Sequence, residues 1–311
     1  MHGLRALQGR PEAKRGEARR LCAAEPTLFV HAHKLENRRS PAANRQSFKE
    51  TIMLRRVSHL TASSVTAADG AIGNVTAAFF DDQSWAIRYL VVDTEKWLPA
   101  REVLISPYSI SQPLPDLSAD KNIHVRLTRE QVKASPDIDT HQPVSRQHER
   151  EYSAYYTYPE YWDGGDMWGM GGLPLMATYP PSPEQIAAAE TLRARDLASA
   201  DSHLRSSVKV VGYDIQATDD SIGHVADFVF DDRSWAIRYL IVDTRNWWPG
   251  GKKVLVPTHW IDSIDWATSS VHVGLTREGV KASPEYDETI EIDRAYETRL
   301  HTAYNRKSYW D

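Results

Sequence analysis

FFDDQSWAIRYLVVDT, residues 79–94, occurs a second time as VFDDRSWAIRYLIVDT, residues 229–244, at an offset of 150 residues. Thirteen of the sixteen positions are identical. Residues 85–92 are rich in β-branched and aromatic side chains and lie between polar turn residues, which is typical of a strand. Side chains alternate between the two faces of a strand, and both faces of this one are mostly apolar. We therefore expect a central strand at the heart of a small barrel whose outer wall is covered as well.

A chain of 311 residues with such a repeat predicts two similar domains. The pattern indicates five segments: a disordered N-terminal extension, residues 1–52; a first barrel, residues 53–140; an aromatic tail, glycine-rich linker and helix, residues 141–202; a second barrel, residues 203–290; and a C-terminal aromatic tail, residues 291–311. Each barrel is expected to hold about six short strands. Gly73 is matched by Gly223 inside a strand-like pattern, which indicates a bulge or a tight bend.

Charge is distributed unevenly along the chain. Residues 1–52 carry 11 Lys/Arg against 5 Asp/Glu, and the remainder has a net charge of −11. Nucleic-acid binding usually needs a basic face, so we do not expect a nucleic-acid partner, although a local basic patch would be compatible with this composition. The basic N-terminal stretch reads either as an extension upstream of a natural start at Met53 or as a tail for an acidic surface.

Composition also excludes several classes of protein. Cys22 is the single cysteine, which excludes a disulfide scaffold and a cysteine-ligated metal site. No apolar run approaches the ~18 residues of a membrane span, and the first residues lack the apolar core of a secretory signal. We expect a cytoplasmic protein with no membrane contact.

The repeated string, followed in both copies by Trp-x-Pro and by Val-Leu-Ile or Val-Leu-Val, resembles the PRC-barrel domain proteins. That family takes its name from the cytoplasmic barrel of the photosynthetic reaction centre H subunit and includes the ribosome-maturation factor. The resemblance covers residues 53–162 and 203–310. It implies a mainly β fold with two tandem PRC-type barrels and short helices in the linker and tails. It supplies no catalytic residues, and for proteins with two similar barrels it implies a link to bacterial stress responses.

Two kinds of charged position qualify as candidate chemistry. Asp81-Asp82, like its second copy, offers paired carboxylates, but adjacent strand residues point to opposite faces, so we interpret the pair as turn residues rather than a site. Arg88 and its equivalent Arg238 lie inside apolar strands, where an unpaired charge is costly. We expect each arginine to pair with a carboxylate such as Asp93 or Asp243, the alternative being contact with a ligand.

Enzyme signatures are absent from the sequence. There is no HExxH metal motif and no GxSxG nucleophile motif, and the glycine-rich residues 164–172 lack the context of a phosphate loop, which favours a linker. We expect no enzymatic activity, no metal and no cofactor.

The function predicted from these patterns is a binding or assembly module with an unidentified protein partner. The candidate interface or binding residues come from the central strands and the aromatic tails: Trp85, Arg88, Tyr89, Trp235, Arg238, Tyr239, Trp162 and Trp310. We expect the two barrels to contact each other through the outer faces of their central strands as a pseudo-dimer, with the Tyr/Trp tails sealing the contact. The alternatives are an RNA- or ribosome-associated factor and an uncharacterised enzyme.

A chain shortened to begin at Met53 should melt within about two degrees of the full chain, because residues 1–52 show no period that would bury them. Thermal unfolding followed by circular dichroism measures the difference. A clear loss of stability would show that the extension packs on the folded part.

Overall fold

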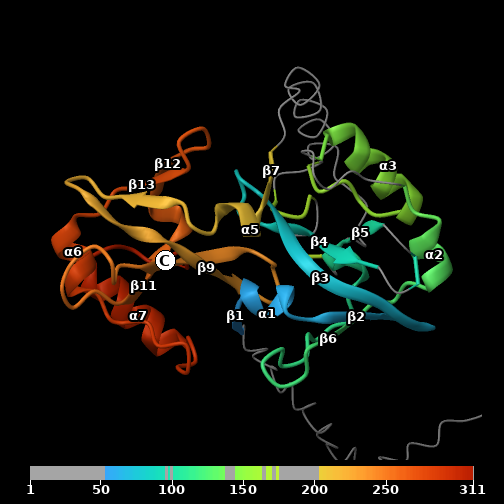
Figure 1. Cartoon of the computed structure of the whole chain (residues 1–311), viewed down its shortest axis with the longest axis horizontal. Helices are drawn as coiled ribbons and strands as arrows, with labels where there is room; N and C mark the ends of the chain where they lie inside the picture. The colour runs from blue at the N-terminus through green and yellow to red at the C-terminus, as the bar shows by residue number, and fades with distance from the viewer. Residues whose placement is uncertain are drawn as a thin grey trace, which may run out of the picture. The chain divides into compact units, whose positions relative to one another are not determined.

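The computed structural model describes residues 53–94, 97–98, 101–136, 144–162, 166–169, 173–174 and 203–310. These residues belong to one compact unit that is mainly β, as predicted, with two sheets and short helices around them (Figure 1). The predicted extension, residues 1–52, and the helix predicted after the glycine-rich linker, before residue 203, lie outside the described residues.

The first sheet has the strand order β5-β4-β3-β2-β6. Neighbouring strands are antiparallel except β2 and β6, which run parallel. The strands are β2 (Ser64–Ala67), β3 (Gly70–Asp81), β4 (Ile87–Asp93), β5 (Glu102–Ile105) and β6 (Asn122–His124). The repeated sequence therefore forms the end of β3, the loop after it and the whole of β4.

The second sheet repeats this arrangement with the order β11-β10-β9-β8-β13-β12. The strands are β8 (Asp214–Gln216), β9 (Ser221–Asp231), β10 (Ile237–Asp243), β11 (Lys253–Pro257), β12 (Ile261–Asp265) and β13 (Ser270–Val273). Here β8 and β13 are the parallel pair, in the position that β2 and β6 hold in the first sheet.

The first strand of each repeat lies in the sheet of the other repeat. β1 (Leu54–Arg56) pairs with the end of β9, and β7 (Leu204–Ser206) pairs with the end of β3. β1 continues into the short helix α1 (Val57–Thr61), which contacts β3 and β9, one strand from each sheet. β7 continues into the short helix α5 (Ser207–Val210), which contacts β3. The two repeats thus exchange equivalent strands reciprocally (Figure 1).

Neither sheet closes into a barrel within the described residues, although barrels were expected. The chain leaves β5 through a 3-10 helix, η1 (Pro107–Ser109), and only the isolated bridge Ile110–Val125 continues toward β6. In the second sheet η2 (Thr258–Trp260) interrupts the chain at the same point, before β12. A 3-10 helix offers no ladder of strand hydrogen bonds, so each sheet has an edge at β5 or β11.

The predicted bulges are confirmed at both glycines. The register of β2 and β3 shifts next to Gly73, and that of β8 and β9 shifts next to Gly223. A Cβ atom on Gly73 would lie 1.8 Å from the carbonyl oxygen of Asp93. Only glycine allows this close approach of two backbones, which lets the long strands bend.

Helices close each repeat. α2 (Arg129–Lys133) begins with a capping box of Thr128 and Gln131, and α6 (Arg277–Ala282) is its equivalent. The aromatic tails form α3 (Arg146–Tyr156) and α7 (Arg294–Ala303), which flank the molecule (Figure 1).

The inner faces of both sheets contribute to one hydrophobic core, in which the rings of Phe80 and Phe228 lie 5.7 Å apart. The outer face of β4 is instead covered by its own repeat, where the ring of Tyr152 on α3 meets the ring of Tyr89 edge-on at 5.3 Å. α7 covers the outer face of β10 in the same way, through Leu300 among others. The expectation that the outer faces of the central strands cover each other was therefore wrong, because each aromatic tail folds back onto its own sheet.

Tyr152→Ala should lower the free energy of unfolding by about 3–5 kcal/mol, because it removes a buried ring and leaves a cavity. The change also removes the hydroxyl that donates to the carbonyl of Leu104 and accepts from the amide of Ser106. Tyr155→Ala, in the same helix, is the matched control, since Tyr155 is 40% exposed, and should cost about 1 kcal/mol or less. Urea unfolding of both variants checks the difference, and equal costs would show that α3 is not needed as a cover.

Candidate functional site

The two copies of the repeated sequence meet at a seam, which we define as residues 81–87 and 231–237 together with β1 and β7. The amide of Ile87 donates to the carbonyl of Trp235 at 2.8 Å, and the amide of Ile237 donates to the carbonyl of Trp85 at 2.7 Å. Both tryptophans have a φ of 58°, a left-handed conformation that bulky residues rarely adopt. In each copy, the tryptophan with this conformation is also the residue whose carbonyl accepts the hydrogen bond from the other copy.

The paired aspartates divide two structural tasks at the seam. The carboxylate of Asp81 accepts from the amides of Gln83 and Ser84, which holds the loop closed. The carboxylate of Asp82 binds the guanidinium of Arg205 at 2.7 Å. Asp81 thus closes the loop, as a turn residue would, although it is buried at the end of β3, whereas Asp82 joins the repeats.

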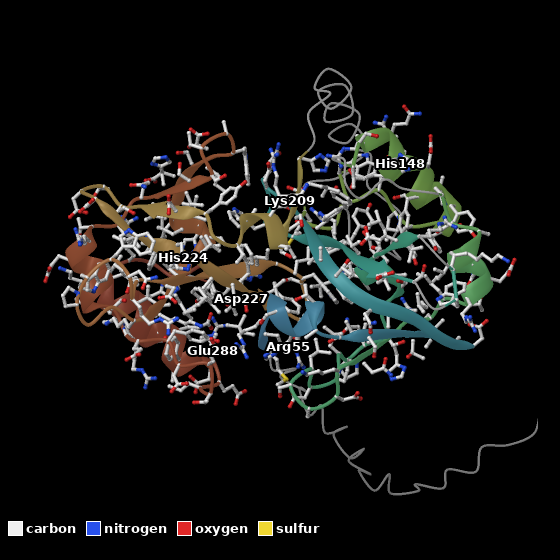
Figure 2. All side chains as sticks on the ribbon, in the orientation of Figure 1. Arg55, His148, Lys209, His224, Asp227 and Glu288 are labelled. Carbon is white, nitrogen blue, oxygen red and sulfur yellow. The ribbon has the colours of Figure 1, made fainter. Side chains whose placement is uncertain are left out.

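The second copy makes the same contacts in the opposite direction. Asp231 accepts from the amides of Arg233 and Ser234, and Asp232 binds the guanidinium of Arg55 at 2.9 Å. Arg55 is 9% exposed and lies on β1 between the two sheets (Figure 2). Each repeat therefore gives an arginine to the other and receives one from it, as in a contact with twofold symmetry.

Arg88 is 2% exposed and is held by several groups at once. Its guanidinium lies 3.5 Å from the carboxylate of Asp81 and donates to the carbonyl of Met167 at 2.6 Å. It also stacks over the ring of Tyr161, 3.7 Å from the centroid. Burial would raise the pKa of Asp81, but the Arg88 charge and the backbone amides of the loop hold that pKa below its ordinary value. The predicted ion pair is therefore present, with Asp81 rather than Asp93 as partner.

A buried glutamate organises the tail behind Arg88. Tyr161 donates to the carboxylate of Glu149 at 2.5 Å, and the guanidinium of Arg146 lies 3.1 Å from the same carboxylate. The ring nitrogen of His203, from the second repeat, lies 3.2 Å from Glu149. Burial raises the pKa of the Tyr161 phenol, so the hydroxyl remains protonated and donates.

The second repeat builds an equivalent network around Glu297. Tyr239 and Tyr309 both donate to this carboxylate, at 2.7 and 2.9 Å, and Arg294 lies 3.1 Å from it. Arg238 binds Asp231 at 3.1 Å and lies over the ring of Tyr309. Sequence reasoning missed both glutamates, although Arg-x-x-Glu opens the tail helix in each copy.

These networks favour a structural role. Each carboxylate in them is already bound by a cation or by phenol donors, and the central groups are shielded from solvent. Among the described residues no group of three or more His, Cys, Asp or Glu side chains is placed to bind a metal ion. None of the helices in the described ranges is long and apolar enough to cross a bilayer.

The eight candidate residues fall into three groups. Trp85 and Trp235 belong to the seam, where the ring of Trp85 stacks on Phe80 at 5.3 Å and Trp235 is fully buried. The remaining candidates belong to the two networks: Arg88, Tyr89 and Trp162 around Glu149, and Arg238, Tyr239 and Trp310 around Glu297. Whether any of them contacts a partner stays a prediction.

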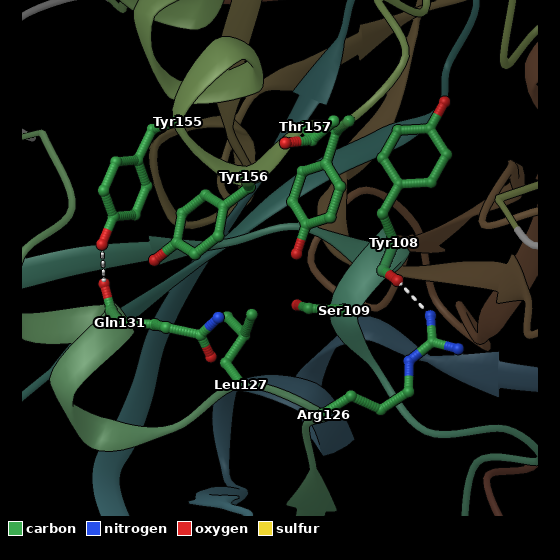
Figure 3. Close-up of a pocket in the computed structure, with 9 residues that line it drawn as sticks. Tyr108, Ser109, Arg126, Leu127, Gln131, Tyr155, Tyr156 and Thr157 are labelled. Carbon is green, nitrogen blue, oxygen red and sulfur yellow. Dashed lines mark hydrogen bonds between the residues drawn. The ribbon is translucent and has the colours of Figure 1, made fainter.

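A pocket of about 390 Å³ opens in the first repeat, and none of the eight candidates lines it (Figure 3). η1, the turn after α3 and the segment that leads into α2 form its walls. Its lining contains four tyrosines and one cation, with Tyr108, Ser109, Arg126, Leu127, Gln131, Tyr155, Tyr156, Thr157 and Tyr158 as members. Burial raises the pKa of Tyr108, Tyr156 and Tyr158, so these phenols stay protonated and offer hydrogen bonds rather than act as bases.

In a comparison with protein families, residues 205–268 match the family model described as PRC-barrel domain. The matched segment runs from β7 to the turn after β12 and includes the second copy of the repeated sequence. No curated protein matches the chain.

Asp81→Asn should destabilise the protein at neutral pH and have a progressively smaller effect as the pH falls below 3.8, the ordinary pKa of an aspartate, toward the lower pKa of the folded protein. The folded protein holds the pKa of Asp81 below that value, so the stability contributed by its charge is present above it and is lost as the carboxylate becomes protonated. Urea unfolding of both proteins between about pH 7 and pH 3 measures the effect. Asp120→Asn, at an exposed position, is the control and should differ from the parent by a small, constant amount; a constant difference for Asp81→Asn would contradict the ion pair.

Proposed function

We propose that the protein is a non-enzymatic binding and assembly module of the cytoplasm, built from two PRC-type repeats that pack as an intramolecular pseudo-dimer. The reciprocal exchange of β1 and β7 carries this proposal. Equivalent strands, equivalent arginine–aspartate pairs and equivalent backbone hydrogen bonds join the repeats in both directions. Such a contact gives two copies of one fold a fixed geometry, which suits the presentation of a composite surface.

The family match supports a PRC-type fold for the second repeat. The near-identity of residues 79–94 and 229–244 and the common strand order extend that proposal to the first. A role in stress responses is implied only by the resemblance of tandem-barrel sequences. A protein partner fits the acidic composition of the folded part better than a nucleic acid does.

A binding role is favoured over catalysis by the way titratable groups are used. The buried carboxylates are occupied by arginines and phenols, and the pocket lining has no carboxylate, histidine, lysine or cysteine among its nine residues. A general acid or base needs a pKa near the working pH, and the buried phenols of the pocket are shifted away from it.

The pseudo-dimer predicts that the repeats stay together after the chain is cut. A protease site inserted between residues 175 and 200 of the full chain allows cleavage after folding, and the two fragments should co-elute as one species in size-exclusion chromatography. Arg55→Ala with Arg205→Ala should lower the denaturant concentration at which they separate, because each change leaves an inter-repeat aspartate unpaired, with a combined cost of about 3 kcal/mol or more.

Arg245→Ala is the matched control for this experiment. Arg245 binds Asp243 within the second repeat and its side chain is 63% exposed, so its loss should leave the fragments together. Fragments of the parent chain that separate into stable monomers would refute the pseudo-dimer.

The composite surface is tested by affinity capture from the organism's own cytoplasm. A partner retained by the parent and the Arg245→Ala protein, but lost by the folded double variant, would support a surface formed by both repeats. Retention that disappears after nuclease treatment would favour the RNA-associated alternative, and undiminished capture by the double variant would place the partner on one repeat alone.

A further inference from the structure

The second repeat has no open pocket at the position equivalent to the pocket of the first repeat, because a side chain of its own fills that position. η1 and η2 align at an offset of 151 residues, which makes Trp260 the equivalent of Ser109. α3 and α7 align at an offset of 148, which makes Tyr304 the equivalent of Tyr156. Trp260 is only 5% exposed, and its indole meets the ring of Tyr304 edge-on at 5.0 Å. An indole therefore occupies the space that Ser109 leaves open.

The indole of the second repeat has a guanidinium beside it. Arg306, the equivalent of Tyr158, has its guanidinium carbon 5.7 Å from the Trp260 ring and donates to the carbonyl of Gly274. Gly274 is in turn the equivalent of Arg126. The arginine of the first repeat is thus at position 126, on the segment before α2, whereas that of the second repeat is at position 306, after α7. Both repeats thus keep a cation at this place, but only the second has an aromatic ring of its own to fill it.

The walls of the open pocket suit a flat aromatic guest. The rings of Tyr156 and Tyr158 are stacked, with 5.3 Å between centroids and 13° between planes, and Tyr108 lies 5.3 Å from Tyr158. The hydroxyl oxygens of Tyr156 and Tyr158 are buried and lie near the side chains of Ser135 and Ser109, so the two residues offer mainly their rings to a guest. A volume of about 390 Å³ lies within the range of roughly 300–1,000 Å³ that small-molecule sites have.

Charge decides what kind of aromatic molecule fits. A cage of tyrosines could also hold a quaternary ammonium group. Arg126 is the only charged residue in the lining, and its guanidinium donates one N–H to the carbonyl of Tyr108 (Figure 3). Arg101 adds a second positive charge near Tyr156. A cation would be repelled, whereas an anionic group would gain a charge-assisted hydrogen bond.

We propose that this pocket binds a small planar aromatic carboxylate, with the ring in the place that Trp260 takes in the second repeat and the carboxylate beside Arg126. The rings of Tyr108, Tyr156 and Tyr158 supply the aromatic surface against which the guest packs. The site lies within one repeat, so it does not depend on how the repeats are joined.

Isothermal titration calorimetry of the full chain with three probes tests the proposal: indole-3-carboxylate, indole-3-carboxamide and phenyltrimethylammonium. The carboxylate should bind with a dissociation constant of about 0.1–1 mM, the amide about tenfold more weakly, and the ammonium not measurably. Failure of the carboxylate to bind at 10 mM, about ten times the weakest expected constant, or tighter binding of the ammonium, would overturn the proposal.

Two variants localise the binding. Arg126→Gln should weaken the carboxylate about tenfold and the amide less than about twofold, because only the carboxylate uses the charge. Arg299→Gln, at an exposed position on α7, is the matched control and should change neither. Equal weakening of both probes by Arg126→Gln, or an unchanged affinity of the carboxylate, would contradict its placement beside Arg126.

Ser109→Trp copies the second repeat into the first and should abolish binding of both indoles while the melting temperature stays the same or rises. Full binding by a folded Ser109→Trp protein would place the site elsewhere. If this variant does not fold, the comparison of Arg126→Gln with Arg299→Gln still decides the outcome, because both changes are at exposed side chains.

Discussion

Two backbone hydrogen bonds, in each of which an amide of one repeat donates to a tryptophan carbonyl of the other, hold the two repeats together, and the rest of the molecule depends on this contact. They require Trp85 and Trp235 to adopt a left-handed conformation, which costs energy for a bulky residue. The surroundings determine that conformation fully: the preceding aspartates close the loops, and the next aspartates bind arginines from the opposite repeat. The sheets then share one core, although each has its own outer cover.

Both repeats satisfy the charge of the arginine in the central strand in the same way. Arg88 and Arg238 lie in the central strands, yet each finds an aspartate seven residues earlier and an aromatic ring from its own tail. The tail helices bring a glutamate to the back of these rings, where phenols and a second arginine satisfy it. The aromatic tails therefore cover their own sheets, and the first tail also contacts His203 of the second repeat through Tyr161. Their tyrosines serve as hydrogen-bond donors as well as apolar cover.

Much of the fold could be predicted from local patterns, because the strands, the bulges at Gly73 and Gly223 and the capping box at Thr128 depend on neighbours in sequence. The partner of Arg88 was assigned wrongly to Asp93 because the assignment followed proximity along the strand, whereas the hairpin brings Asp81 back to it. The strand exchange was beyond reach, since Leu54-Arg55 and Leu204-Arg205 read identically and nothing local states which sheet each joins. The pocket was missed for another reason: Ser109 is unremarkable alone and gains meaning only beside Trp260.

The exchanged strands also set an order for synthesis of the chain. β1 is made early, but its partner strand β9 is made about 175 residues later, since Leu54 pairs with Asp231. During that interval the end of β3 is equally without its neighbour, because β7 has not yet been made. An unpaired strand end with apolar neighbours can join a second nascent chain, whose own β1 is waiting too. The strand exchange that joins the two repeats thus leaves the growing chain exposed to pairing with neighbouring chains on one messenger RNA, and a holding chaperone or slow dilution on refolding should raise the yield of correctly paired monomer.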